Sequence, residues 1–226
     1  MSKNFFQTVS TGVFDRSGFD TISERVFFGV LGSVLIYGFL VTAFVANSCS
    51  GMFVHGINWL TVIFVGLVIP ILGIMIAVKS SNPFISFIGY NMVVIPFGVI
   101  LSPVLQIYSP NVIRDAFCIT AIDVMTMSVL AVIFPGFFSK LGGALFIALL
   151  GLVVVQIIRC FVPFLANLTI IDWIGAGIFS LYVGFDWWRA NNVPKTLDSA
   201  VDLALDLYLD IINLFLFILK ILGKKD

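Results

Sequence analysis

Hydrophobic residues along this chain gather in seven runs, and short polar stretches separate each run from the next. Most runs hold roughly 20 residues, the length at which an α-helix crosses the hydrocarbon part of a membrane. The pattern therefore predicts an all-α membrane protein, a bundle of seven transmembrane helices. The predicted helices span Val26–Ala46, Ile57–Val78, Phe84–Tyr108, Val112–Phe138, Ala144–Phe164, Leu168–Trp188 and Ser199–Leu222.

The short connections leave no space for a soluble domain, so the pattern predicts one membrane domain over residues 1–226. Residues 1–25 are mixed polar and aromatic and exceed the charged leader of a cleavable signal, so we expect a cytoplasmic tail and a retained first helix. The composition agrees, because 60% of the chain is hydrophobic and 11% is charged. These values exclude a soluble globular domain and, with a net charge of zero, give no indication of a nucleic-acid partner.

The basic residues favour a cytoplasmic N-terminus, because cytoplasmic loops carry an excess of Lys and Arg. In this orientation only Arg114 and Arg159 lie on the outer side, and the cytoplasmic segments hold Lys3, Arg16, Arg25, Lys79, Lys140, Arg189 and Lys195. Lys220, Lys224 and Lys225 oppose the rule if the seventh helix crosses fully. A full crossing with these lysines reaching the interface is favoured over a re-entrant helix.

Two carboxylates stand in the apolar part of the last two predicted helices, Asp186 and Asp210. Trp187, Trp188 and Arg189 follow Asp186 directly, a pattern typical of a helix end at the membrane interface. We expect residues 199–206 to extend into water or the headgroups, which puts Asp210 about one turn inside, at the depth of Asp186. A carboxylate inside a membrane is costly, so both are candidate functional residues.

The last helix also carries a polar stripe, since Asp202, Asp206, Asp210 and Asn213 recur every three or four residues along one face. Facing lipid, this stripe would be unsatisfied, so the pattern predicts that the last helix is buried in the middle of the bundle. Two neighbouring carboxylates cannot both ionise cheaply, so Asp186 and Asp210 would share a proton or bind a cation.

The segments FSLYVGFD, ending at Asp186, and LYLDIINLF, containing Asp210, resemble the last two helices of the Bax inhibitor-1 family, also called the transmembrane Bax inhibitor motif family. The resemblance implies a bacterial-type, seven-helix membrane protein that mediates a pH-sensitive calcium leak. It further implies that Asp186 and Asp210 are the functional aspartates, with calcium and protons as ligands. Carboxylate oxygens are the ligands that calcium prefers.

Two further residues have two interpretations each. The resemblance implies that an arginine near the end of the second helix can close the pore by pairing with the sixth-helix aspartate. This chain has a single basic residue there, Lys79, which either takes that role or only marks the inner interface. Asp123 lies mid-helix with threonines at positions 120 and 126. It is either a second cation station or an acid held neutral by hydrogen bonds to a neighbouring helix. Asp172 reads as an acid that complements the dipole at a helix start.

The rival functional hypothesis is a regulator of a membrane partner, such as a membrane protease or a cell-death factor, without transport of its own. Under it, the aspartates serve packing and the phenylalanine-rich surface meets the partner. An enzyme is not expected, because the chain shows no nucleophile, metal or phosphate motif. No cofactor is expected either, since the three cysteines are scattered. The compact loops favour the plasma membrane of a bacterium.

Overall fold

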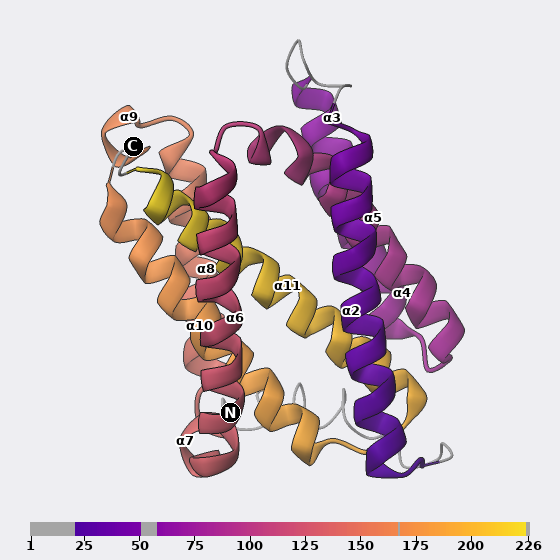
Figure 1. The fold of residues 1–226 in the computed structure, drawn as a ribbon. Helices are drawn as coiled ribbons and strands as arrows, with labels where there is room; N and C mark the ends of the chain where they lie inside the picture. The colour runs from indigo at the N-terminus through magenta and orange to yellow at the C-terminus, as the bar shows by residue number, and fades with distance from the viewer. Residues whose placement is uncertain (1–20, 51–57, 167, 225–226) are drawn as a thin grey trace, which may run out of the picture. The chain divides into compact units, whose positions relative to one another are not determined.

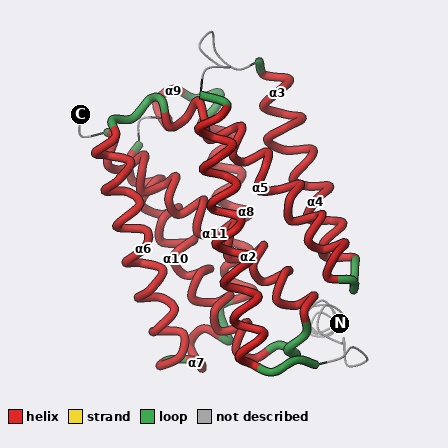
Figure 2. The backbone as a smooth tube through the Cα atoms, turned by 45° about the vertical axis from the view of Figure 1, so that its right-hand side comes forward, coloured by secondary structure: helices red, strands yellow, loops and turns green. Residues whose placement is uncertain are grey.

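The computed structural model describes residues 21–50, 58–166 and 168–224, and every regular element in these ranges is a helix (Figure 1, Figure 2). Seven long helical segments occupy the described ranges, so the predicted fold class is confirmed there. Most of the predicted N-terminal tail, residues 1–20, lies outside the described residues. The chain divides into two compact units, so the prediction of one domain stays a prediction.

Unit 1 comprises Met1–Pro103 and Asn192–Leu205. Its described helices are α2 (Glu24–Ser48), α3 (Trp59–Ile63), η1 (Phe64–Val68), α4 (Ile69–Lys79), most of α5 (Pro83–Leu105) and the start of α11 (Leu197–Gly223). Polar side chains fix two of the helix starts: Ser23 accepts a hydrogen bond from the Val26 N–H, and Asn58 accepts one from the Leu60 N–H. Each cap satisfies a backbone donor that has no partner inside its helix.

The second predicted helix is continuous but irregular, because α3, η1 and α4 follow one another without a break. The π-helical turn η1 lies directly before Pro70, and the Ile69 N–H bonds to the carbonyl of Phe64 instead of that of Val65. A proline ring clashes with the carbonyl four residues before it, and a wider turn relieves that clash. Pro70 thus accounts for the irregular turn in this span.

Helices α4 and α5 approach each other through two glycines. A Cβ atom added to Gly73 would lie 2.6 Å from the carbonyl oxygen of Gly89, and one added to Gly89 would lie 2.5 Å from the carbonyl oxygen of Gly73. Small residues let transmembrane helices pack backbone to backbone, where dispersion contacts replace the hydrophobic effect that lipid removes. Gly73 and Gly89 thus allow the close approach of α4 and α5.

Unit 2 comprises Val104–Asn191 and Asp206–Asp226. Its helices are α6 (Pro110–Ile133), α7 (Pro135–Phe138), α8 (Gly142–Arg159), α9 (Pro163–Ala166), α10 (Thr169–Asn192) and the remainder of α11. Its apolar core joins α10 to α11, with the rings of Phe179 and Phe217 stacked at 5.9 Å. The Phe217 ring also fills the space beside Gly175, where a Cβ would lie 2.5 Å from it.

The fourth and fifth predicted helices are shorter than expected. α6 ends at Ile133, and α7 forms a separate turn from Pro135. Phe134 leaves the helical region, at φ −120° and ψ 54°, because the residue before a proline is disfavoured in the α conformation. α8 likewise ends at Arg159, ahead of the short α9 that starts at Pro163.

Helix α11 is buried along almost its whole length, as predicted for the last helix. The apolar residues of its first turns are covered by protein, so residues 199–206 are not the water-exposed extension that was expected, and their depth relative to the headgroups stays a prediction. Ala200 and Ala204 have 0% exposure, and Leu203 and Leu205 have 2%. Alternating small and leucine side chains in this segment pack on both sides of the helix, so the acidic residues between them do not make it a solvent-exposed extension.

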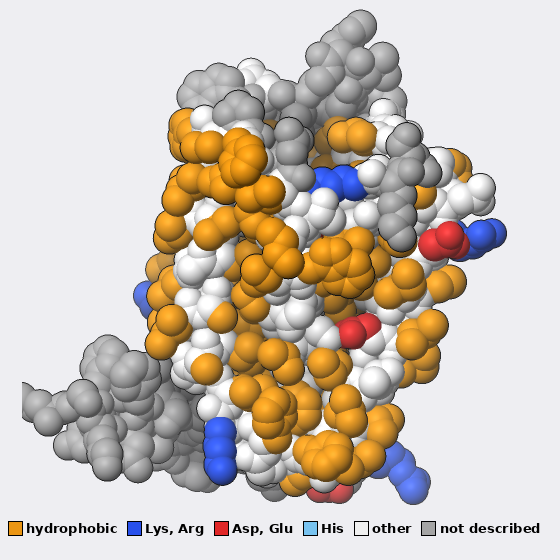
Figure 3. Space-filling model, turned by 90° about the vertical axis from the view of Figure 1, so that its left-hand side faces the viewer, with side chains coloured by type: hydrophobic (Ala, Val, Ile, Leu, Met, Phe, Trp, Pro, Cys, Tyr) orange, Lys and Arg blue, Asp and Glu red, His pale blue; other side chains and the backbone are white. Residues whose placement is uncertain are grey.

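The surfaces of both units carry many exposed aliphatic and aromatic side chains, among them Phe44, Phe84 and Phe117. Figure 3 shows hydrophobic side chains over much of the face in view, with few and separate charged ones. Five described segments, α2, Leu60–Lys79, α5, α6 and α8, are long and apolar enough to cross a membrane. α10 and α11 have 24 and 27 residues but carry the acidic positions. The chain is a multi-pass membrane protein.

Candidate functional site: a buried aspartate pair with one arginine

Asp186 lies in the last third of α10, inside unit 2, with 3% of its surface exposed. A glycine two residues earlier permits close packing there, because the Phe138 ring of α7 lies against Gly184 where a Cβ would clash. The interruption of the helix at Phe134 thus places α7 against the segment that carries Asp186.

Asp210 lies on α11, also inside unit 2, with 8% of its surface exposed. The carboxyl groups of Asp186 and Asp210 lie close enough to interact electrostatically with each other. An ionised carboxylate only accepts hydrogen bonds, so a hydrogen bond between the two groups would require a proton on one of them. Among the described residues, no hydrogen-bond partner is found for Asp210 Oδ2. Two neighbouring buried carboxylates repel each other when both are ionised, so the arrangement favours a shared proton or a bound cation.

Arg189 is the cation of this site. Its Nη1 donates to Asp186 Oδ1 and to Asp206 Oδ2, both at 2.8 Å. The arginine side chain is 20% exposed and that of Asp206 is 36% exposed, whereas that of Asp186 is 4% exposed. Arg189 therefore lies between the buried Asp186 and the half-exposed carboxylate of Asp206.

The charges of the site do not cancel. With one proton on the pair, two carboxylate charges face one guanidinium, and loss of that proton leaves three. Tyr182, one turn before Asp186 on α10, lies close enough to interact electrostatically with both aspartates of the pair. The net negative charge favours a proton or a cation, and carboxylate oxygens are suitable ligands for a hard cation.

Sequence reasoning identified Asp186, Asp210 and Asp206 but missed the role of Arg189, which it interpreted as a marker of the membrane interface. The available signal was spacing, because an arginine three residues after an aspartate lies on the same helix face. α10 in fact continues beyond Arg189 to Asn192, so the tryptophans do not mark the end of the helix.

The other candidate residues lie elsewhere or have local partners. Asn213 donates to the Leu209 carbonyl of its own helix at 2.7 Å. Asp202 and Lys79 belong to unit 1, while Asp186 belongs to unit 2, so the latch between Lys79 and Asp186 stays a prediction.

Asp123 of α6 accepts two hydrogen bonds from the hydroxyl of Ser180 on α10, at 2.7 and 2.9 Å. The threonines that flank it do not contribute, since Thr120 and Thr126 donate to carbonyls of their own helix. This geometry favours the interpretation of Asp123 as an acid held by a neighbouring helix.

Asp172 has more than the helix-start role expected of it. It is fully buried and accepts hydrogen bonds from Arg159 at 2.7 Å and Lys224 at 2.9 Å. Across the described residues, the aspartate site included, no group of three or more His, Cys, Asp or Glu side chains is arranged so that it could hold a metal ion. A cation at the aspartate pair would thus be held by few protein ligands and by water.

Comparison with known proteins agrees with the resemblance carried by the last two helices. The family model described as inhibitor of apoptosis-promoting Bax1 matches residues 24–226. The inner membrane protein YbhL of Escherichia coli (strain K12) is 27% identical over 230 residues, covering 93% of this chain and 94% of YbhL. The uncharacterized protein YrjE of Lactococcus lactis is 28% identical over 202 residues, covering 86% and 85%.

A further relative is an uncharacterized protein of Helicobacter pylori (strain J99), 30% identical over 164 residues, which covers 72% of this chain and 70% of the relative. The match to the family model includes every helix that the structure describes, so it covers both units and the aspartate site together. The chain belongs to the Bax inhibitor family of membrane proteins.

Proposed function

We propose that this chain is a pH-sensitive calcium leak channel in which Asp186 and Asp210 form the site that binds protons and calcium. The observation that carries the proposal is the meeting of two buried, interacting carboxyl groups beside an arginine that pairs with one of them. The choice of calcium rests on the family resemblance and on the preference of this ion for carboxylate oxygens. The proposal assigns no chemical reaction to the chain.

Protons and calcium compete for the pair under this proposal. When the pair holds its proton, the site carries less negative charge and binds a divalent cation weakly. When the proton leaves, three carboxylates face one guanidinium, and the added repulsion favours a cation between them. Arg189 holds Asp186 and Asp206 through one nitrogen atom, so a cation that binds the acids competes with this arginine. A change in packing follows only if the two packings differ in their affinity for protons or calcium.

The orientation and location are part of the proposal. A cytoplasmic N-terminus puts the loop between α10 and α11 on the cytoplasmic side, and the aspartate site then opens toward the cytoplasm. The bacterial plasma membrane is proposed from the inner-membrane relative and from the absence of long connections in the sequence.

The test is calcium flux into proteoliposomes that contain only the purified chain, measured with a trapped calcium dye from pH 5 to pH 8. We expect flux in the wild type to depend on pH and to lose this dependence in Asp186→Asn and in Asp210→Asn. Asp115→Asn is the matched control, because Asp115 is an exposed acid paired with Arg114 on the surface of α6. The site assignment is wrong if both single variants keep the wild-type pH dependence.

The same measurement distinguishes the channel from the rival, a regulator of a membrane protease or another membrane partner. The exposed rings of Phe117, Phe161 and Phe164 suit contact with lipid and equally with a partner helix. If the wild type conducts no calcium in partner-free liposomes at any pH, the channel proposal fails and the regulator is favoured.

A further inference from the structure

We propose that a second site, at the other end of unit 2 from the aspartate pair, binds the phosphate group of an anionic ligand. Asp172 and Asp186 lie on the same helix, 14 residues apart, which is about 21 Å along the axis. The second site therefore does not share ligands with the calcium site, and it is independent of the proposed function. Its members are Gln156, Arg159, Asp172, Lys220 and Lys224.

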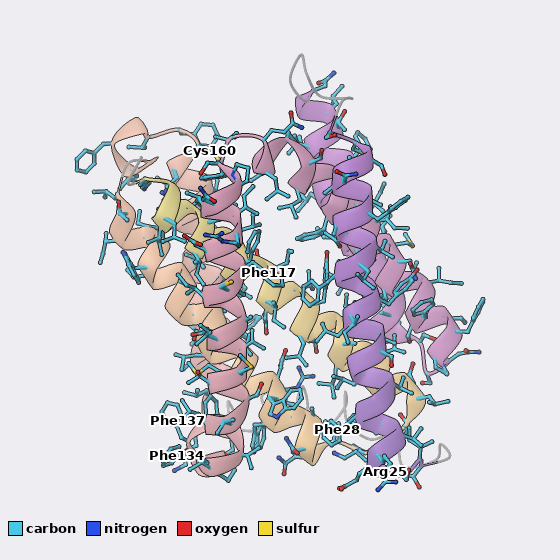
Figure 4. The ribbon with its side chains drawn as sticks, viewed as in Figure 1. Arg25, Phe28, Phe117, Phe134, Phe137 and Cys160 are labelled. Carbon is cyan, nitrogen blue, oxygen red and sulfur yellow. The ribbon has the colours of Figure 1, made fainter. Side chains whose placement is uncertain are left out.

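Three helix ends build this site. Arg159 is the last residue of α8, Asp172 lies in the first turn of α10, and Lys220 lies in the last turn of α11. Figure 4 labels Cys160, the residue after α8, at one end of unit 2, and Phe134 and Phe137 beside α7 at the opposite end. Because the ends of apolar spans lie at the level of lipid headgroups, the cluster is at the depth where lipid phosphates occur.

The polar core of the cluster is a buried ion pair. Arg159 donates to Asp172 Oδ1 at 2.7 Å and to Asp172 Oδ2 at 3.3 Å, and Lys224 donates to Asp172 Oδ2 at 2.9 Å. Asp172 has no exposed side-chain surface, whereas 10% of the Arg159 side chain and 32% of that of Lys224 is exposed. Asp172 therefore fixes the two cations in place, while the cations themselves reach the surface.

The cluster has an excess of positive charge. Lys220 adds a third cation, with its ammonium 5.3 Å from the centroid of the Phe217 ring. Three cations against one carboxylate leave a net charge of +2 when all four groups are ionised. A second metal site is excluded by this sign, because a cation would be repelled.

A cavity of about 320 Å³ lies among these side chains, lined by Gln156, Arg159, Cys160, Asp172, Lys220 and Lys224. A cavity at the headgroup level lined by a guanidinium, two ammonium groups and an amide suits a phosphate, which accepts several hydrogen bonds at once and is attracted by the excess positive charge. With a cytoplasmic N-terminus, this end of the helices lies on the outer side, where the positive-inside rule predicts few basic residues. A phosphate site would explain why Arg159, Lys220 and Lys224 lie there. The phosphate can come from a phospholipid or from the aqueous phase.

The experiment measures thermal unfolding of the delipidated, detergent-solubilised chain against added phosphatidylglycerol, phosphatidylcholine or inorganic phosphate, at constant ionic strength. We expect phosphatidylglycerol to raise the unfolding temperature more than the zwitterionic phosphatidylcholine does. Lys224→Gln and Lys220→Gln should each weaken the apparent affinity about fivefold, the effect expected for one basic residue near a lipid surface. Lys140→Gln is the control, because that lysine lies in the connection between α7 and α8.

Each result decides the proposal. A response to phosphatidylglycerol that Lys224→Gln and Lys220→Gln weaken identifies a lipid headgroup site, and an equal, variant-sensitive response to inorganic phosphate identifies a site for free phosphate. The proposal is overturned if none of the three additives stabilises the wild type. It is also overturned if Lys224→Gln and Lys220→Gln both respond to the additives as the wild type does. Comparing each variant with and without ligand separates the effect on binding from a general loss of stability.

Discussion

Arg189 Nη1 lies 2.8 Å from Asp206 Oδ2, and this ion pair joins the end of α10 to α11. The same nitrogen atom donates to Asp186. One guanidinium therefore links a half-exposed carboxylate to the buried pair, and its positive charge offsets part of the negative charge of the site. Substitutions of Arg189 and of Asp206 are therefore expected to shift the midpoint of calcium flux against pH in opposite directions.

Arg189→Gln removes the only cation that contacts these acids among the described residues. An opposite charge within hydrogen-bonding distance favours an ionised carboxylate, so the pair should keep its proton to higher pH without it. We expect the midpoint of the flux against pH to rise by about one unit or more. The measurement is calcium flux in proteoliposomes, with Arg114→Gln as the surface control. An unchanged midpoint in Arg189→Gln would contradict the role of this arginine.

Asp206→Asn removes a negative charge beside the pair and leaves Asp186 as the remaining carboxylate that holds Arg189. Less repulsion lets the pair lose its proton more easily, so the flux midpoint should move to lower pH, by up to about one unit. Because Asp206 is 36% exposed, solvent screens the effect, and it should be smaller than that of Arg189→Gln. A shift to higher pH would show that Asp206 acts mainly by positioning Arg189.

Ser180→Ala removes the hydroxyl that donates to both oxygens of Asp123. Loss of a donor to a partly buried acid should lower the free energy of unfolding by about 1 to 3 kcal/mol. Thermal unfolding in detergent measures this, and Thr126→Val is the control, because the Thr126 hydroxyl donates to the Ile122 carbonyl of its own helix. The pH dependence of calcium flux should not change in Asp123→Asn; its loss would make Asp123 part of the cation path.

Gly73→Ala should destabilise the packing of α4 on α5, because the new Cβ would meet a carbonyl oxygen at 2.6 Å and the Met92 Cβ at 2.8 Å. Backbone atoms cannot rotate away, so the helices must separate, at a cost of about 1 to 3 kcal/mol. Gly29→Ala is the matched control, since nothing lies within 4 Å of its Cβ position. There the higher helix propensity of alanine should stabilise the chain by up to about 1 kcal/mol. Equal unfolding temperatures for the two variants would contradict the close approach.

Much of the fold could be predicted because each helix is specified by local chemistry. Runs of apolar residues set the seven spans, and Ser23 or the residue before Pro135 sets where a helix begins or ends. The burial of residues 199–206 could not be predicted in this way. Acidic residues recur there every four positions, and only the neighbours in the fold decide whether the faces between them are covered.

The candidate site was predictable in part for a similar reason. An acid in an apolar helix, such as Asp210, is visible in a sequence because it is costly there. A cation such as Arg189 is ordinary at a membrane interface, so its second role depends on a partner from another helix. The same holds for Asp172, whose partners Arg159 and Lys224 lie 13 residues before it and 52 after it.

Helix α11 supplies residues 197–205 to unit 1 and residues 206–223 to unit 2, and it follows every other described helix in the chain. Neither unit is complete until α11 has been made. Its aspartates also make it a poor substrate for insertion into lipid alone, since each costs about 3 kcal/mol at the membrane centre. The earlier helices must therefore be in the bilayer before α11 can pack against them. A chain truncated before α11 would lack part of the packing of both units.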